Sequence, residues 1–213
     1  MFIPIGDVNP TRTRPFVNYA LLGINIAVFL ALCFPEPSDN VLLKYALIPQ
    51  LSDPKTFLTS MFLHANLLHL IGNMLFLWIF GDNIEDQLGH VAYLLIYVAF
   101  GLAASFAHIW TTTDPNVPTL GASGAISGVI GAYVVFFPSH KIRMLMLFYY
   151  FVRVFHVAAV WWIGFWIIEQ VIFQWMGMPG VAYMAHIGGC VAGIVVALVF
   201  RFVFFSRSFR AEA

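Results

Sequence analysis

Charged residues are scarce in this chain. Only 9% of its 213 residues are Asp, Glu, Lys or Arg, whereas 61% are apolar. A soluble domain carries about a quarter charged residues, so the composition excludes an ordinary soluble protein. The formal net charge is zero and the basic residues form no stripe that could follow a phosphate backbone, which argues against nucleic acid as a partner. The composition predicts an integral membrane protein whose surroundings are a lipid bilayer.

Cysteine is almost absent, and so is a cleavable signal. Cys33 and Cys190 lie inside apolar runs, where a free thiol packs as a small hydrophobe, so a disulfide scaffold is not expected. Arg12 and Arg14 precede a long apolar run, but no small-residue cleavage site with a polar domain follows it. We therefore expect the first apolar run to remain in the protein as a signal anchor.

Long apolar runs are abundant. A helix needs about 20 apolar residues to cross a hydrocarbon core of about 30 Å, because each residue rises about 1.5 Å. Six runs reach or approach this length, at residues 16–34, 68–86, 91–110, 121–137, 155–176 and 182–205. We predict an all-α membrane protein, a six-transmembrane-helix bundle that forms a single domain over residues 1–213.

Two other segments are too short or too polar to cross. Residues 34–66 are interrupted by prolines, and we expect them to form an interfacial loop with short helices between the first and second helices. The run "MLMLFYYFV" at 144–152 lies between Arg143 and Arg153. We expect it to rest on the cytoplasmic surface.

The basic residues predict the orientation. Lys44 and Lys55 fall on one side of the six-helix arrangement. The other side collects the remaining basic residues, which are Arg12, Arg14, Lys141, Arg143, Arg153, Arg201, Arg207 and Arg210. Because basic residues are enriched in cytoplasmic loops, both termini are predicted to be cytoplasmic, by default in a bacterial inner membrane.

The fourth run is short. From Gly124 to Phe137, before Pro138, it spans about 21 Å of helix against about 30 Å of hydrocarbon. If its inner end reaches the cytoplasmic interface, Ser123 lies several ångströms below the outer surface. A reactive group there would need a water-filled cavity that opens to the outer side.

Polar residues at membrane depth are costly unless they are paired or functional. Ser123 lies near the start of the fourth run and His186 near the start of the sixth, while His69 and Asn73 share one face of the second. Each alone has a structural explanation, as a small packing residue or a hydrogen-bonded helix bridge. Together they supply the nucleophile, the general base and the oxyanion donors of acyl transfer.

Small residues follow both candidate groups at helical spacing. They are Ser127 and Gly131 after Ser123, and Gly189, Gly193 and Ala197 after His186. Such faces let two helix backbones approach closely, which would bring the imidazole within reach of the hydroxyl. No carboxylate lies at a matching depth, and the nearest candidate, Asp114, is in a loop that the sequence does not place. A Ser-His dyad is therefore the simpler prediction.

The segments "HANLLHLIGN" (64–73), "GASG" (121–124) and "AHIGG" (185–189) occur in this order on the second, fourth and sixth predicted helices. This combination resembles the rhomboid family of intramembrane serine proteases, in its six-span bacterial form. The resemblance implies that Ser123 is the nucleophile and His186 the base, and that the Ser123 backbone N–H, His69 and Asn73 form the oxyanion hole. It implies supporting roles for His64, Gly121, Gly124, Gly189 and Gly193, and a structural role on the cytoplasmic side for Glu85.

The resemblance also implies a reaction. The expected substrates are single-span membrane proteins, cut in or next to the transmembrane segment without a metal or cofactor. A helical peptide bond is hydrogen-bonded and shielded, so the segment must unwind before Ser123 can reach it. The chain departs from the family pattern at Ser127, where some members carry a tyrosine that stacks on the histidine, and it lacks a Trp-Arg pair between residues 35 and 66. Ser127 is then a candidate to orient His186.

Two other functions remain open. A rhomboid-like client-binding protein without catalysis would lack the serine or the histidine, and both are present here. A haem or metal protein could use His69 and His186 as ligands, which would leave Asn73 without a role. Glu169 is a carboxylate inside the predicted span 155–176. In one interpretation, Glu169 is protonated or paired and faces the bundle. In the other, it makes a polar contact that holds the aromatic-rich helix 155–176 closed as a lateral gate for the substrate.

Overall fold

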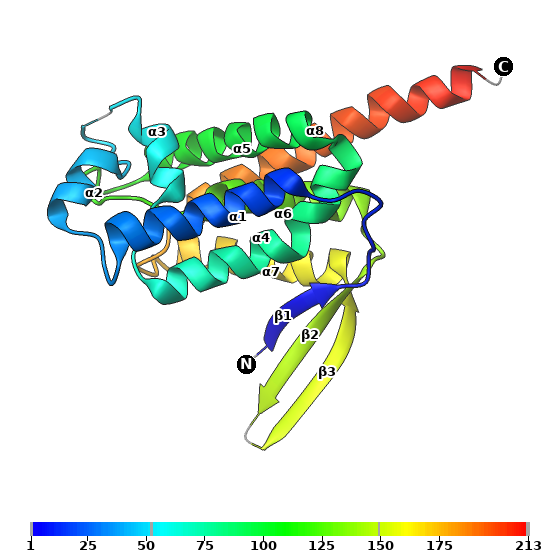
Figure 1. The fold of residues 1–213 in the computed structure, drawn as a ribbon, viewed down its shortest axis with the longest axis horizontal. Helices are drawn as coiled ribbons and strands as arrows, with labels where there is room; N and C mark the ends of the chain where they lie inside the picture. The colour runs from blue at the N-terminus through cyan, green and yellow to red at the C-terminus, as the bar shows by residue number, and fades with distance from the viewer. Residues whose placement is uncertain (1, 52, 149, 212–213) are drawn as a thin grey trace.

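The computed structural model describes residues 2–211 except 52 and 149, and the side chains of residues 204–211 are left out. The protein is mostly helical (Figure 1). Its helices are α1 (Phe16–Val28), α2 (Asp39–Tyr45), α3 (Thr56–Thr59), α4 (Leu67–Leu88), α5 (His90–Thr111), α6 (Ser123–Phe136), α7 (Ala159–Trp175) and α8 (Tyr183–Ala211). Its strands are β1 (Phe2–Asp7), β2 (Lys141–Phe148) and β3 (Phe151–Ala158). A π-helical turn (Phe29–Cys33) extends α1, and a 3-10 turn (Ser60–Phe62) follows α3.

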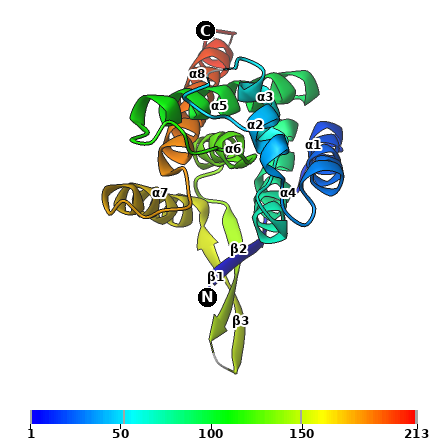
Figure 2. The ribbon, with the colours of Figure 1, turned by 90° about the vertical axis from the view of Figure 1, so that its left-hand side faces the viewer.

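Helix α6 is the centre of the bundle. It packs against α4, α5, α7 and α8, and Figure 2 shows it enclosed by them. Every residue from Gly124 to Tyr133 is buried. A helix that is apolar on all sides is stable only when other helices or lipid cover it. The position of α6 is therefore fixed from every direction, including at its first residue, Ser123.

Within the described part of the chain, four helices are long and apolar enough to cross a membrane. They are Phe16–Cys33, Leu67–Leu88, His90–Thr111 and Tyr183–Val203. Helix α6 is apolar but has only 14 residues, as its sequence predicted, and α7 has 17. Large apolar side chains such as Trp110 and Trp161 are exposed on the outside of the bundle. Surfaces of this kind identify an integral membrane protein.

The prediction of an all-α chain is wrong at one end of the molecule. Residues 144–148 and 151–152 belong to a β-hairpin in which β2 pairs with β3 from Lys141↔Ala158 to Phe148↔Phe151, and β1 adds a third antiparallel strand. The hairpin projects away from the helices (Figure 1). The fifth helix therefore begins at Ala159 instead of residue 155. Apolar length alone does not separate a strand from a helix, and the β-branched and aromatic residues of 151–158 favour a strand.

The segment at 34–66 contains α2, α3 and the 3-10 turn. These short helices lie at the end of the bundle opposite the C-terminus (Figure 1). Short helices were expected here, and their location at a membrane interface stays a prediction. Of the basic residues that predicted the orientation, Arg207 and Arg210 have side chains outside the described residues.

Two carboxylates, the buried Glu85 and the half-buried Asp7, link the elements at the end of the bundle opposite α2 and α3. Glu85 has no exposed surface, and its carboxylate accepts the backbone N–H groups of Val17 at 2.9 Å and Asn18 at 2.7 Å, in the first turn of α1. A negative charge at a helix N-terminus is stabilised by the helix dipole. Asp7 of β1 accepts hydrogen bonds from Tyr133 of α6 at 2.6 Å and Asn83 of α4 at 3.0 Å. Burial raises the pKa of the Asp7 carboxyl.

These contacts give Glu85 a structural role that can be measured. Glu85→Ala removes the acceptor of two N–H groups, and a hydrogen bond to a charged group contributes about 1.5–3 kcal/mol. We expect a loss of stability on the order of 3 kcal/mol, seen as a lower midpoint of thermal unfolding in detergent. Glu36→Ala, which changes an exposed carboxylate before α2, should melt like the wild type. Equal midpoints for the two variants would contradict this role.

Candidate active site

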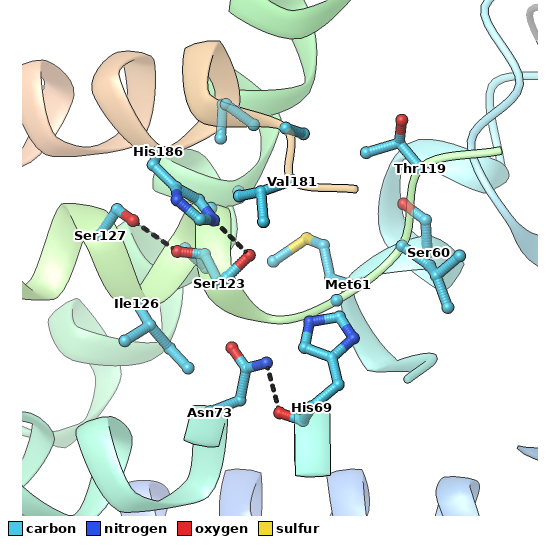
Figure 3. A pocket seen from close by; sticks show the side chains of 18 of the residues that line it. Ser60, Met61, His69, Asn73, Thr119, Ser123, Ile126, Ser127, Val181 and His186 are labelled. Atoms are coloured by element: carbon cyan, nitrogen blue, oxygen red, sulfur yellow. Dashed lines mark hydrogen bonds between the residues drawn. The ribbon is translucent and has the colours of Figure 1, made fainter. Parts of the chain in front are cut away.

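The helices α4, α6 and α8 begin at the same end of the bundle and surround one cavity. Its volume is about 520 Å³, and its lining includes Ser123, His186, His69 and Asn73. Figure 3 shows these four side chains converging from three helices. The structure therefore brings together the residues that the sequence singled out as nucleophile, base and oxyanion donors.

Ser123 and His186 are in hydrogen-bond contact. The Ser123 Oγ and the His186 Nε2 are 2.8 Å apart, although 63 residues separate them in the sequence. Ser123 is the first residue of α6, and His186 lies in the first turn of α8. This distance is within the range in which an imidazole can remove a proton from a hydroxyl.

The other nitrogen of His186 meets a residue that the sequence analysis missed. His186 Nδ1 is 2.8 Å from Oε1 of Gln170, a buried side chain of α7. Trp166, also of α7, lies against the same imidazole, with ring centroids 6.1 Å apart and planes at 28°. The two residues are four apart and so share a face of α7, a pattern that could have drawn attention to them.

Two candidates for orienting His186 prove wrong. The Ser127 hydroxyl donates instead to the backbone carbonyl of Ser123 at 2.6 Å, one turn back in α6. Serine side chains within helices commonly make this local bond. Asp114, the carboxylate considered for a triad, accepts the backbone N–H of Asn116 within its own loop at 3.0 Å. Gln170 occupies the position that either residue would have needed.

Glu169, the neighbour of Gln170, has a different environment. It is half-buried, and within the described residues it makes no hydrogen bond or ion pair. Successive residues of a helix point about 100° apart, so Glu169 and Gln170 cannot face the same partner. The polar contact between α7 and α8 therefore involves Gln170, and the suggested closing contact through Glu169 is not formed.

Hydrogen-bond donors gather beside the Ser123 hydroxyl. As the first residue of α6, Ser123 has a backbone N–H without an intrahelical acceptor, at the positive end of the helix dipole. His69 and Asn73 project from α4 towards this turn (Figure 3), and the Asn73 amide donates to the His69 carbonyl at 2.9 Å. An anionic oxygen held next to Ser123 would meet these groups.

Gly121 makes the turn before α6 possible. Its φ is 125°, a conformation that residues with a Cβ rarely adopt. A Cβ at this position would also lie 2.8 Å from the His69 ring. Glycine therefore allows both the turn and the approach of His69 to it.

His64 supports His69 from behind. The ring of His64 is fully buried and packs edge-to-face against His69, with centroids 5.1 Å apart. Burial lowers the pKa of His64 to about 4, so this ring stays neutral at physiological pH. It is placed to fix the ring of His69 and does not line the cavity.

Glycines bring α6 and α8 into backbone contact. A Cβ on Gly189 or Gly193 would overlap the carbonyl oxygen of Gly124 or Gly128, respectively. Gly124 is also close to α5, where an added Cβ would lie 2.6 Å from that of Ala104. Only small residues permit helices to pack this closely. The contact places the first turns of α6 and α8 side by side.

Comparison with known proteins gives a consistent result. A family model described as "Rhomboid domain" matches residues 52–202. The chain is 33% identical over 188 residues to "Rhomboid protein 1, mitochondrial" of Saccharomyces cerevisiae, covering 83% of this chain and 51% of the relative. It is 30% identical over 153 residues to "Rhomboid-like protein 11, chloroplastic" of Arabidopsis thaliana, covering 66% and 50%. It is 33% identical over 126 residues to "Rhomboid protease GluP" of Bacillus subtilis, covering 56% and 24%.

These matches cover part of each relative. The chain spans about half the length of the first two relatives and about a quarter of the third. The names of the first two place those proteins in mitochondria and chloroplasts. The comparisons therefore do not support the expectation of a bacterial inner membrane.

The contact between α6 and α8 yields a stability prediction. Gly193→Ala forces a methyl group against the Gly128 carbonyl, and overpacking of this kind costs about 1–3 kcal/mol. We expect a lower midpoint of thermal unfolding in detergent. The matched control is Gly23→Ala in α1, where an added Cβ meets no atom within 4 Å. A Gly193→Ala variant as stable as this control would mean that α6 and α8 are not in backbone contact.

Proposed function

The chain belongs to the rhomboid family, and on this premise we propose that it is an intramembrane serine endopeptidase. It cleaves peptide bonds in or next to the transmembrane segments of membrane proteins by means of a Ser-His dyad. The observation that carries the proposal is the 2.8 Å contact of Ser123 Oγ with His186 Nε2, in a cavity at the end of a membrane bundle.

The geometry supports the following proposed reaction. Ser123 attacks the carbonyl carbon of the scissile bond while its proton passes to His186 Nε2. The oxyanion that forms is stabilised by the Ser123 N–H and by the side chains of His69 and Asn73. His186 then gives the proton to the leaving amine, and a water molecule, activated by the same imidazole, hydrolyses the acyl-enzyme. These protein groups supply every role, so the proposed reaction uses no metal or cofactor.

The proposed topology has six spans in one domain over residues 1–213. Helices α6 and α7 cross in addition to the four longer ones, and the segment at 34–66 lies at the outer interface. Because α6 has 14 residues, it spans about 21 Å of a hydrocarbon core of about 30 Å. With both termini and the hairpin on the cytoplasmic side, Ser123 lies below the outer surface, and the cavity opens outward.

The proposed substrates are single-span membrane proteins. A cavity of about 520 Å³ holds a few residues of extended chain and no helix of about 10 Å diameter. A transmembrane helix must therefore unwind locally before its peptide bond can reach Ser123. Segments with small or helix-weakening residues near the cut meet this requirement most easily.

The rival functions fit the site less well. A client-binding protein without catalysis has no need of the Ser123–His186 contact. A metal or haem held by His69 and His186 would have to displace Ser123 or Gln170, because each ring nitrogen of His186 already has a partner at 2.8 Å. A visible absorption spectrum of the purified protein tests the haem alternative.

The decisive test is cleavage of model single-span substrates by the purified protein in liposomes. We expect the wild type to produce two fragments whose masses locate the cut in or next to the membrane segment. Ser123→Ala and His186→Ala should each reduce the rate at least about a thousandfold, because nucleophile and base act as a unit. Cleavage by Ser123→Ala at the wild-type rate would refute the assignment.

Covalent labelling tests whether Ser123 is a reactive nucleophile without the need for a suitable substrate. A fluorophosphonate should modify Ser123 in the wild type, and peptide mapping should locate the adduct. Ser139→Ala, which changes an exposed serine after α6, should be labelled like the wild type, whereas Ser123→Ala should not be labelled. Labelling elsewhere, with Ser123 unmodified, would favour a client-binding protein.

A further inference from the structure

We propose that Gln170 positions His186 for its task as a base, by holding it in the tautomer whose Nε2 can accept the Ser123 proton. The inference deepens the proposed function and rests on it. Gln170 does not line the cavity, and its hydrogen-bond contact is with His186. It acts through the imidazole and is a positioning residue, supplied by α7.

The geometry of the contact supports this role. The amide oxygen of Gln170 is 2.8 Å from His186 Nδ1, on the far side of the ring from Ser123. The Gln170 side chain is buried, with 6% of its surface exposed. A buried hydrogen bond of this kind is retained because a lost partner would leave a polar group without compensation.

The chemistry follows from the proton count. A neutral imidazole carries one N–H, on either Nδ1 or Nε2. An amide oxygen can only accept, so beside Gln170 the proton lies on Nδ1, and the lone pair of Nε2 faces the Ser123 hydroxyl. In the opposite tautomer Nε2 would donate to Ser123 and could not remove its proton. With its amide oxygen turned towards Nδ1, as in the structure, Gln170 holds the productive tautomer, as the carboxylate does in a serine protease triad, but without its charge.

Trp166 completes the support from the same helix. Its ring lies against the face of the imidazole at 6.1 Å and 28°, while Gln170 binds the edge. The contact with Trp166 limits rotation of the imidazole ring, and the contact with Gln170 sets which ring nitrogen faces Ser123. Together they do what a stacking tyrosine does in some family members, at a site where this chain has Ser127.

Other titratable groups must be considered before any pH dependence is assigned to this pair. His69 from α4 and His108 from α5 are the other titratable side chains that line the cavity. His108 is engaged with the Thr119 hydroxyl at 2.7 Å. Glu169 of α7 does not line the cavity. A shift of the pH profile that appears only when the residue at position 170 is charged can therefore be assigned to His186.

The test compares three variants on a model single-span substrate in liposomes. Gln170→Met keeps the length of the side chain and removes the acceptor, and we expect kcat to fall about 10- to 100-fold with KM unchanged. Gln170→Glu restores an acceptor and should recover most of kcat. Gln174→Met makes the same change at an exposed position one turn along α7 and should leave both constants unchanged.

The pH profile reports whether the side chain at position 170 is in contact with His186. A carboxylate at position 170 stabilises the protonated imidazole, so the acid limb of the kcat profile for Gln170→Glu should move to higher pH. A side chain at position 170 that is not in contact with the imidazole would leave the limb in place. A wild-type kcat in Gln170→Met, or an unmoved acid limb in Gln170→Glu, would overturn the proposal. If Gln170→Met does not fold, the limb in Gln170→Glu decides.

A spectroscopic readout keeps this inference distinct from the proposed function. In protein labelled with ¹⁵N-histidine, the His186 signals should show the Nδ1–H tautomer, and Gln170→Met should convert them to a mixture. This result does not require any substrate to be cleaved. An Nε2–H tautomer in the wild type would refute the role of Gln170 even if Ser123 proved to be the nucleophile. The expected tautomer in a protein that cleaves nothing would instead refute the proteolytic function alone.

Discussion

The backbone contact between α6 and α8 is the constraint on which the site depends. Gly189 and Gly193 of α8 lie directly against the carbonyl oxygens of Gly124 and Gly128, so no side chain separates the two helices. Because Ser123 and His186 occupy the first turns of these helices, backbone contact brings their side chains to 2.8 Å. In the membrane such contacts arise from van der Waals packing, since lipid is as apolar as the helices. The glycines therefore matter as much to the site as its polar residues do.

Helix α6 makes its polar side-chain contacts with other elements near its two ends. Helix α6 is buried from Gly124 to Tyr133 and presents apolar or small residues throughout. Its side-chain hydrogen bonds to other elements are that of Ser123 with His186 at one end and that of Tyr133 with Asp7 of β1 towards the other. In the proposed six-span topology, a short central helix with polar ends would let water reach Ser123 while its middle remained dry. The shortness of α6 would then make its first residue accessible.

The sequence predicted the site better than the architecture around it. The spacing of small residues in "GASGAISGVIG" and "AHIGGCVAG" specified which faces of two helices meet, and the depth argument placed Ser123 near one end. The strand at 151–158 was missed because its apolar content resembles the start of a helix. Gln170 was missed because a buried glutamine has no charge or motif to mark it, and only the packing of α7 shows which of Glu169 and Gln170 faces His186.

The contribution of α7 also constrains how a substrate can reach the cavity. Both Gln170 and Trp166 belong to α7, so the orientation of His186 depends on the position of this helix. Trp162, one turn before Trp166, packs on Phe76 and Phe80 of α4, with ring centroids 5.7 Å apart in both pairs. A substrate that separated α7 from α4 would break these aromatic contacts. It would also move Gln170 away from the imidazole, unless α7 tilted in such a way that the contact between Gln170 and His186 was kept. A substrate can therefore enter beside α7 only if the contact of Gln170 with His186 is in place when Ser123 attacks. Helix α7 must either keep its position during entry or return to it beforehand.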